Sequence, residues 1–150
     1  MTEPARAPLP TSTTLRPALA LLAGLGITVL IVFLGVMITT LAALRGVDPK
    51  AYVAPLWTYP THLLISAFGA AMGGFATARI TTGHSLFTTF VLALILLMSA
   101  LTPVLRGTPG GPGQPDWYPL SLAIVSPLGA MLGGLLERRR ARISPPATSP

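Results

Sequence analysis

Four long runs of this chain contain no charged residue, and this pattern restricts the possible fold more than any other feature. The runs are 17–44, 51–78, 80–105 and 117–136. A helix needs about 20 predominantly apolar residues to cross the hydrocarbon core of a bilayer, and each run provides at least that many. The sequence therefore predicts an all-α polytopic membrane protein with four transmembrane helices.

The composition supports a lipid environment. Charged residues make up 9% of the 150 residues and hydrophobic residues 51%, whereas soluble domains carry about 25% charged residues. The net charge of +6 does not indicate nucleic-acid binding, because the basic residues flank the apolar runs and do not line one face. We expect the lipid bilayer as a partner and no nucleic acid. The chain has no cysteine, which excludes disulfides and thiolate metal sites.

The basic residues are distributed unequally around the four runs. Seven lie in the terminal segments and in the link between the second and third runs: Arg6, Arg16, Arg79, Arg138, Arg139, Arg140 and Arg142. The other two links hold only three: Arg45, Lys50 and Arg106. Cytoplasmic segments of membrane proteins carry the excess of Lys and Arg, so both termini are expected in the cytoplasm. The preference for Arg over Lys indicates a GC-rich bacterial genome, and hence the bacterial inner membrane.

The two halves of the sequence look like copies of each other. Leu44-Arg45-Gly46 recurs as Leu105-Arg106-Gly107, after the first and third runs. Each half contains two spans, so both copies would have the same orientation, as a parallel repeat about an axis along the membrane normal. We predict a membrane domain over 17–140, hairpin repeats at about 17–79 and 80–138, and flexible cytoplasmic tails at 1–16 and 141–150.

Helix ends can be predicted from proline and glycine. Pro17 suits the first turn of the first helix, where its missing N–H is not needed, and this helix is expected to end at Leu44. Gly46 and Gly107 are expected to adopt the left-handed conformation that ends a helix. Pro60 and Pro119 are expected to open the second and fourth helices. Aromatic residues precede both of these prolines and are predicted to be anchors at the membrane interface: Trp57, Tyr59, Trp117 and Tyr118.

Small residues recur at four-residue spacing on the second and fourth spans. They are Gly69, Ala70, Gly73 and Gly74, and their counterparts Gly129, Ala130, Gly133 and Gly134. Small residues let helices approach closely in lipid, where no hydrophobic effect drives them together. We therefore predict helix packing at Gly69, Gly73, Gly74, Gly129, Gly133 and Gly134, with the second and fourth spans in contact near the cytoplasmic side.

Few residues inside the spans could carry chemistry. The charge-free runs contain no Asp, Glu, Lys or Arg, which argues against a proton relay and against an enzyme. Hydroxyl side chains such as Thr28, Ser66 and Ser99 commonly bond back to their own helix. His62 is a candidate ligand for haem or a chlorophyll-type magnesium, although a histidine at this position is more often a polar group at the water boundary; His84 is a weaker candidate. Pro127 is predicted to kink the fourth helix.

The combination of Tyr59-Pro60, the small residues from Gly69 to Gly74, and Arg79 resembles uncharacterised small four-helix bacterial inner-membrane proteins. The resemblance covers roughly residues 17–140. It implies four transmembrane helices and carries no activity, cofactor or site residue.

We expect a non-catalytic accessory or scaffolding subunit of a larger bacterial membrane complex, possible hosts being respiratory or photosynthetic complexes. Apolar helix faces and the lack of an internal polar site favour this function, with other membrane-protein subunits as partners and no cofactor. Two alternatives remain open. One is a small oligomeric transporter or channel, and the other is a haem- or pigment-binding membrane protein that uses His62.

Overall fold

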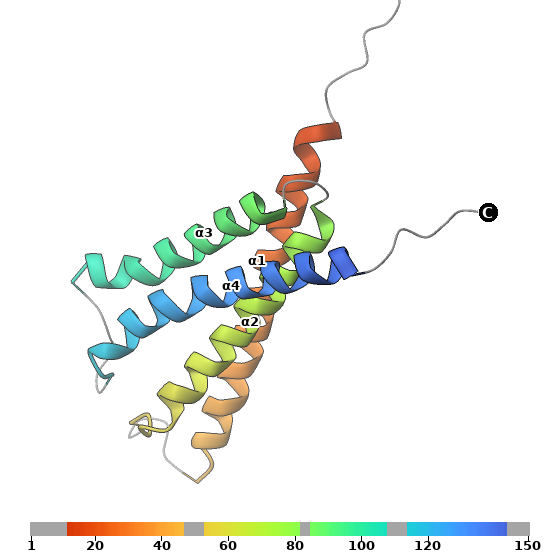
Figure 1. Cartoon of the computed structure of the whole chain (residues 1–150). Coiled ribbons are helices and arrows are strands. Elements are labelled where there is room, and N and C mark those ends of the chain that lie inside the picture. Colours follow the sequence, from red (N-terminus) through yellow and green to blue (C-terminus); the bar gives the residue numbers. More distant parts are fainter. Residues whose placement is uncertain (1–11, 47–52, 82–84, 108–113, 144–150) are drawn as a thin grey trace, which may run out of the picture.

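The structure, a computed structural model, describes residues 12–46, 53–81, 85–107 and 114–143 (Figure 1). It is all-α in this part of the chain. The four helices are α1 (Ser12–Ala43), α2 (Thr58–Ile80), α3 (Ser85–Leu105) and α4 (Trp117–Ile143). All four are long and apolar enough to cross a membrane, which confirms the predicted number and type of elements.

Two helices extend beyond the ends expected from the sequence. α1 begins at Ser12, so Pro17 lies inside the helix and not in its first turn. A proline this close to the start of a helix removes a single hydrogen bond, to the carbonyl four residues earlier. α4 continues to Ile143, because the segment after Leu136 contains no Gly or Pro and is rich in arginine, a good helix former. The rest of both predicted tails, 1–11 and 144–150, lies outside the described residues.

Glycine ends α1 and α3 in the predicted way. Gly46 and Gly107 have φ values of 79° and 67°, the left-handed conformation that a side chain would disfavour. Just before them, the helical hydrogen-bond pattern persists: the N–H of Leu44 donates to the carbonyl of Thr40 at 2.9 Å, and that of Arg106 donates to Thr102 at 3.1 Å.

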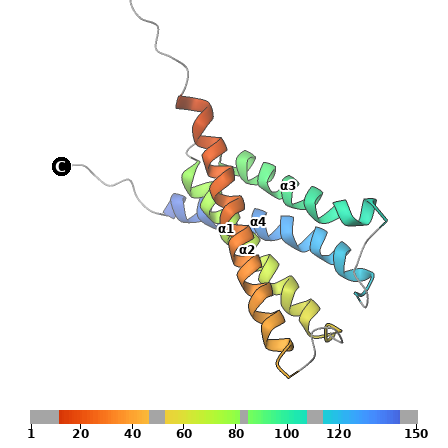
Figure 2. The same cartoon turned by 180° about the vertical axis from the view of Figure 1, so that it is seen from behind.

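The helices form two hairpins, α1–α2 and α3–α4, that pack through α2 and α4. α1 packs mainly on α2, and α3 packs mainly on α4, while α1 and α4 do not touch. The two hairpins cross at an angle, so α1 and α3 separate toward the ends at which each hairpin turns (Figures 1 and 2). The start of α1 and the end of α4 both lie on the side of the molecule away from these turns, although apart from each other (Figures 1 and 2).

Glycines bring the backbones of α2 and α4 into direct contact. A Cβ atom built on Gly133 would overlap the carbonyl group of Ala71, and one on Gly74 would overlap that of Ala130. A Cβ on Gly129 would lie 2.6 Å from the carbonyl oxygen of Ala67. Each contact is with backbone, so none can be relieved by turning a side chain. The predicted contact between the second and fourth helices is therefore made by these three glycines.

The other two glycines of α2 face α1 instead. Gly73 packs against Thr28, and Gly24 packs against Thr77, so each helix inserts a threonine over a glycine of its partner. The Thr77 hydroxyl donates to the carbonyl of Gly73 at 2.9 Å and lies 3.3 Å from the carbonyl of Ala20 on α1. Gly69 extends the same contact: a Cβ there would lie 3.0 Å from the Val32 side chain.

Gly134 of α4 faces α3. A Cβ on Gly134 would lie 2.6 Å from the methyl carbon of Thr89. The glycines of α2 and α4 thus serve three helix contacts, α1–α2, α2–α4 and α3–α4. The fully buried hydrophobic residues of the described helices are Ala20, Ala70 and Ala130, which are small, and Leu92 of α3. Close backbone packing of this kind is what stabilises helix bundles in lipid.

Candidate functional site: a groove between the two hairpins

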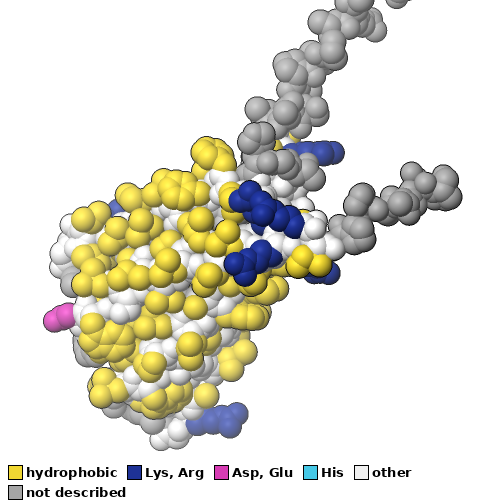
Figure 3. Space-filling view, viewed as in Figure 1, with side chains coloured by type: hydrophobic (Ala, Val, Ile, Leu, Met, Phe, Trp, Pro, Cys, Tyr) yellow, Lys and Arg dark blue, Asp and Glu magenta, His cyan; other side chains and the backbone are white. Residues whose placement is uncertain are grey.

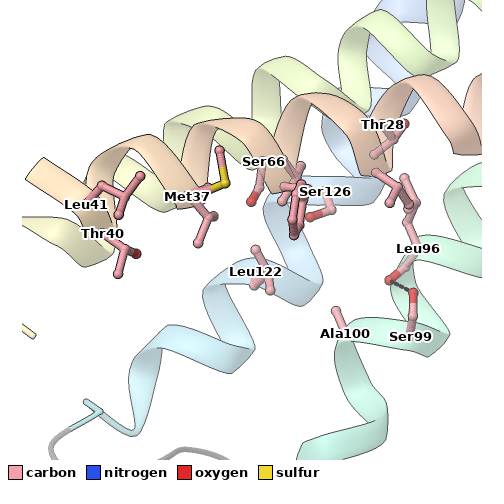
Figure 4. Close-up of a pocket in the computed structure, with 14 residues that line it drawn as sticks. Thr28, Met37, Thr40, Leu41, Ser66, Leu96, Ser99, Ala100, Leu122 and Ser126 are labelled. Carbon is pink, nitrogen blue, oxygen red and sulfur yellow. Dashed lines mark hydrogen bonds between the residues drawn. The ribbon is translucent and has the colours of Figure 1, made fainter. Parts of the chain in front are cut away.

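A groove of about 690 Å³ lies where α1 and α3 separate, with α2 and α4 beneath it (Figure 4). Most of its wall comes from one face of α1, on which residues follow the three- and four-residue spacing of a helix stripe. The lining residues are Thr28, Val29, Val32, Phe33, Val36, Met37, Thr40, Leu41, Ser66, Leu96, Ser99, Ala100, Leu122 and Ser126. All are aliphatic or aromatic, except for five hydroxyl side chains and Met37, and none is charged.

Three of the five hydroxyls, those of Thr40, Ser66 and Ser126, form no side-chain hydrogen bond with any described residue. Thr40 is only partly buried. Ser66 is on α2 and Ser126 is on α4, and both line the groove (Figure 4). Both residues are more than nine-tenths buried, with 5% and 8% of their surface exposed.

The other groove hydroxyls with assigned bonds behave as the sequence predicted. Thr28 donates to the carbonyl of Gly24 at 2.9 Å, and Ser99 donates to that of Ile95 at 2.8 Å. Ser66 was expected to bond back to α2 in the same manner and does not. The free hydroxyls of this serine pair could not be predicted from the sequence, because serine in a helix commonly bonds back to its own helix.

The serine pair lies deep along both helices. Ser66 is eight residues from the start of α2 at Thr58, and Ser126 is nine residues from the start of α4 at Trp117. At 1.5 Å per residue, these separations correspond to about 12 and about 14 Å along the helix axes. Half of a hydrocarbon core is about 15 Å, so in a bilayer the pair would lie near its mid-plane.

The predicted interfacial aromatics cluster where α2 and α4 begin. Tyr59 contacts Tyr118 and Trp117 edge to face, with ring centroids 5.2 and 6.5 Å apart. Tyr59 is buried by this contact, whereas Trp57 and Trp117 remain about half exposed. Edge-to-face pairs add a specific attraction to the area that they bury. The cluster therefore joins the two central helices at this end, and Trp57 and Trp117 retain the exposed surface that an anchor needs.

His62 lies on α2 and contacts α1. Its Nε2 is 2.8 Å from the hydroxyl oxygen of Thr39, and that hydroxyl is also within hydrogen-bond distance of the carbonyls of Gly35 and Val36. A metal or haem iron bound through Nε2 would have to displace this contact. The described residues contain no group of three or more His, Asp or Glu able to hold a metal ion. His84 lies outside them.

Pro127 lies inside α4, one residue after Ser126. Because proline has no N–H, the carbonyl of Ala123 lacks its usual helical donor. The helix nevertheless continues without interruption to Ile143. The kink itself stays a prediction.

No protein-family model matches this sequence, and neither a curated protein nor a solved structure matches the chain.

Proposed function

We propose that this chain is an integral membrane protein whose four helices cross the bilayer as two tandem hairpins, with both termini in the cytoplasm. The observation that carries this proposal is the apolar surface of the described helices. Large hydrophobic side chains are exposed on every helix, Leu22, Leu64, Phe87 and Leu132 among them. Patches of this extent cannot face water in a stable soluble monomer.

The charges support the same orientation. Arginines gather near the C-terminal end of α4, single charged side chains appear at the opposite edges of the molecule, and apolar side chains cover most of the face between them (Figure 3). Arg79 and Arg138, on neighbouring helix ends, are both exposed. Exposed arginines at the end where α1 begins and α4 finishes fit a cytoplasmic face.

The internal repeat is supported by burial. Ser66, Gly69 and Gly73 are buried on α2, and their counterparts Ser126, Gly129 and Gly133 are buried on α4. A duplicated hairpin accounts for this agreement. The surroundings have diverged, since Gly73 packs on α1 while Gly133 packs on α2.

Within the membrane, we propose a non-catalytic accessory or scaffolding subunit of a larger bacterial complex. The support comes from α1, whose apolar span is only 11% buried, compared with 39% for α2 and α4. Leu30 and Ile38 lie on its exposed surface, outside the groove. A helix with so little contact inside its own chain has a face available for a neighbouring subunit.

A photo-crosslinking residue at Leu30 tests this function in native membranes. We expect adducts of discrete mass that contain a second protein, identified by mass spectrometry. The matched control is the same residue at Leu132, which is exposed to a similar degree on α4 (59% against 57%). If Leu30 yields only lipid adducts and the chain purifies in mild detergent as a solitary monomer, the subunit proposal is wrong.

The groove supports one alternative, a small oligomeric transporter or channel. Its five hydroxyls could line a path between two chains. Within a single chain, the α2–α4 backbone contact at Gly74 and Gly133 blocks the way beyond the groove. This alternative therefore requires an oligomer. Solute flux across liposomes that contain the oligomer, with no flux across liposomes that contain a monomeric preparation, would favour it.

A further inference from the structure

We propose that the groove binds an uncharged, lipophilic carbonyl compound of the isoprenoid-quinone type, whose carbonyl oxygen accepts hydrogen bonds from Ser66 and Ser126. The depth of this site in the bilayer rests on the membrane insertion proposed above. The ligand site itself goes beyond the accessory-subunit function.

The serine pair supplies the recognition. Buried hydroxyls normally have a hydrogen-bond partner, and a hydroxyl without one destabilises the protein. Ser66 and Ser126 have none among the described residues, and both residues are more than nine-tenths buried. Among the described residues, the fully buried side-chain atoms without a partner include neither serine oxygen, so the two hydroxyls are accessible from the groove that they line. Ser66 precedes Ala67, whose carbonyl faces Gly129, and Ser126 lies three residues before Gly129, so the two donors are at a similar level of the groove. A bound carbonyl would complete their hydrogen bonding.

The rest of the lining determines the class of ligand. None of the lining residues is charged, so an ionised ligand would have no counter-ion in the groove. Val32, Val36 and Phe33 of α1 form an apolar wall along which a hydrocarbon tail can lie. The volume of about 690 Å³ is within the roughly 300–1,000 Å³ typical of sites for small molecules and cofactors.

The depth of the pair distinguishes this ligand from an ordinary phospholipid. Ester carbonyls of bilayer phospholipids lie in the interfacial region, outside the hydrocarbon core. Ser66 and Ser126 lie about 12 and about 14 Å along their helices from the ends that carry the aromatic cluster. A ligand that reaches them must carry its oxygen deep among the acyl chains, as the ring of a lipophilic quinone does.

Binding of decylubiquinone to the full chain in dodecyl maltoside, followed by isothermal titration calorimetry, tests the proposal. We expect saturable binding, weakened about tenfold by each of Ser66→Ala and Ser126→Ala and about a hundredfold by the double variant, since one neutral hydrogen bond corresponds to roughly a factor of ten. Decylbenzene, which has the same tail and no carbonyl, should bind the wild type and the double variant equally.

Ser99→Ala is the matched control, because Ser99 lines the same groove but donates to Ile95. We expect this variant to bind the quinone as the wild type does. Circular dichroism should give equal helical content for all variants, since the two serines make no internal bond.

The proposal is overturned if the wild type does not bind the quinone or if the double variant binds it equally well. It is also overturned if the serine pair instead holds a second copy of the chain, so that its replacement only converts a dimer to a monomer. Failure of membrane insertion would be seen separately, by maleimide labelling of single cysteines introduced into the chain, which has none of its own.

Discussion

Gly133→Ala is expected to destabilise the fold by about 3 kcal/mol or more, at or above the upper end of the usual cost of overpacking. The added methyl group would overlap the carbonyl of Ala71 and lie 2.9 Å from the backbone nitrogen of Phe75. Neither atom can move unless α2 and α4 separate, and these two helices hold the hairpins together. Unfolding in mixed detergent micelles, followed by circular dichroism, measures the change in free energy.

Gly26→Ala is the control for this substitution. Gly26 also lies inside a helix, but no atom is within 4 Å of its Cβ position. Alanine should be neutral or slightly stabilising there, because it has the higher helix propensity. If Gly133→Ala and Gly26→Ala change the free energy of unfolding equally, the close contact between α2 and α4 does not exist.

Gly73→Ala is expected to cost about 2–3 kcal/mol by disrupting the contact between α1 and α2. Its methyl group would overlap the Thr28 hydroxyl and lie 2.5 Å from the carbonyl oxygen of Gly24. Adding Thr28→Ala should restore only part of the stability, because the Gly24 carbonyl remains in place. The same unfolding measurement applies.

Gly134→Ala provides the comparison. All three of the nearest atoms around its Cβ position belong to the Thr89 side chain. The substitution should therefore cost less than Gly73→Ala, and Thr89→Ala should relieve most of the loss. Two results would contradict the packing described for these two glycines. One is full recovery of stability when Thr28→Ala is added to Gly73→Ala. The other is no recovery when Thr89→Ala is added to Gly134→Ala.

The existence and approximate limits of the helices could be predicted because each depends on a local signal. Uncharged runs of sufficient length define the spans, and Gly46 and Gly107 end α1 and α3 in the left-handed conformation expected of them. Boundaries were least accurate where a helix extends beyond its apolar run. Ser12 and Ile143, the outer limits of α1 and α4, lie in segments whose helicity depends on propensity and not on hydrophobicity.

The partner of each glycine could not be read from the sequence. Gly73 and Gly74 are adjacent, yet Gly73 faces α1 and Gly74 faces α4, because neighbouring residues differ by about 100° around a helix. Which face meets which helix depends on the crossing angle, and side-chain spacing alone restricts this angle only to broad classes. The sequence pattern could show that the small residues pack, but not that they serve three contacts.

The groove depends on the same crossing angle. It exists because α1 and α3 diverge while α2 and α4 stay together (Figure 2). Ser66 and Ser126 line it together only in that arrangement. Their polarity was visible in the sequence, but the absence of an internal hydrogen-bond partner is a three-dimensional property.

The central claim is that four helices cross the bilayer and return both termini to the cytoplasm. The chain has no cysteine, so single cysteines can be introduced at Leu56 and Leu105, near the hairpin turns, and at Ile143, at the end of α4. All three positions are at least 74% exposed. In intact cells, a membrane-impermeant maleimide should label Leu56→Cys and Leu105→Cys, and should label Ile143→Cys only after permeabilisation. Labelling of Ile143→Cys from outside, or equal labelling of all three in a water-soluble fraction, would contradict the account.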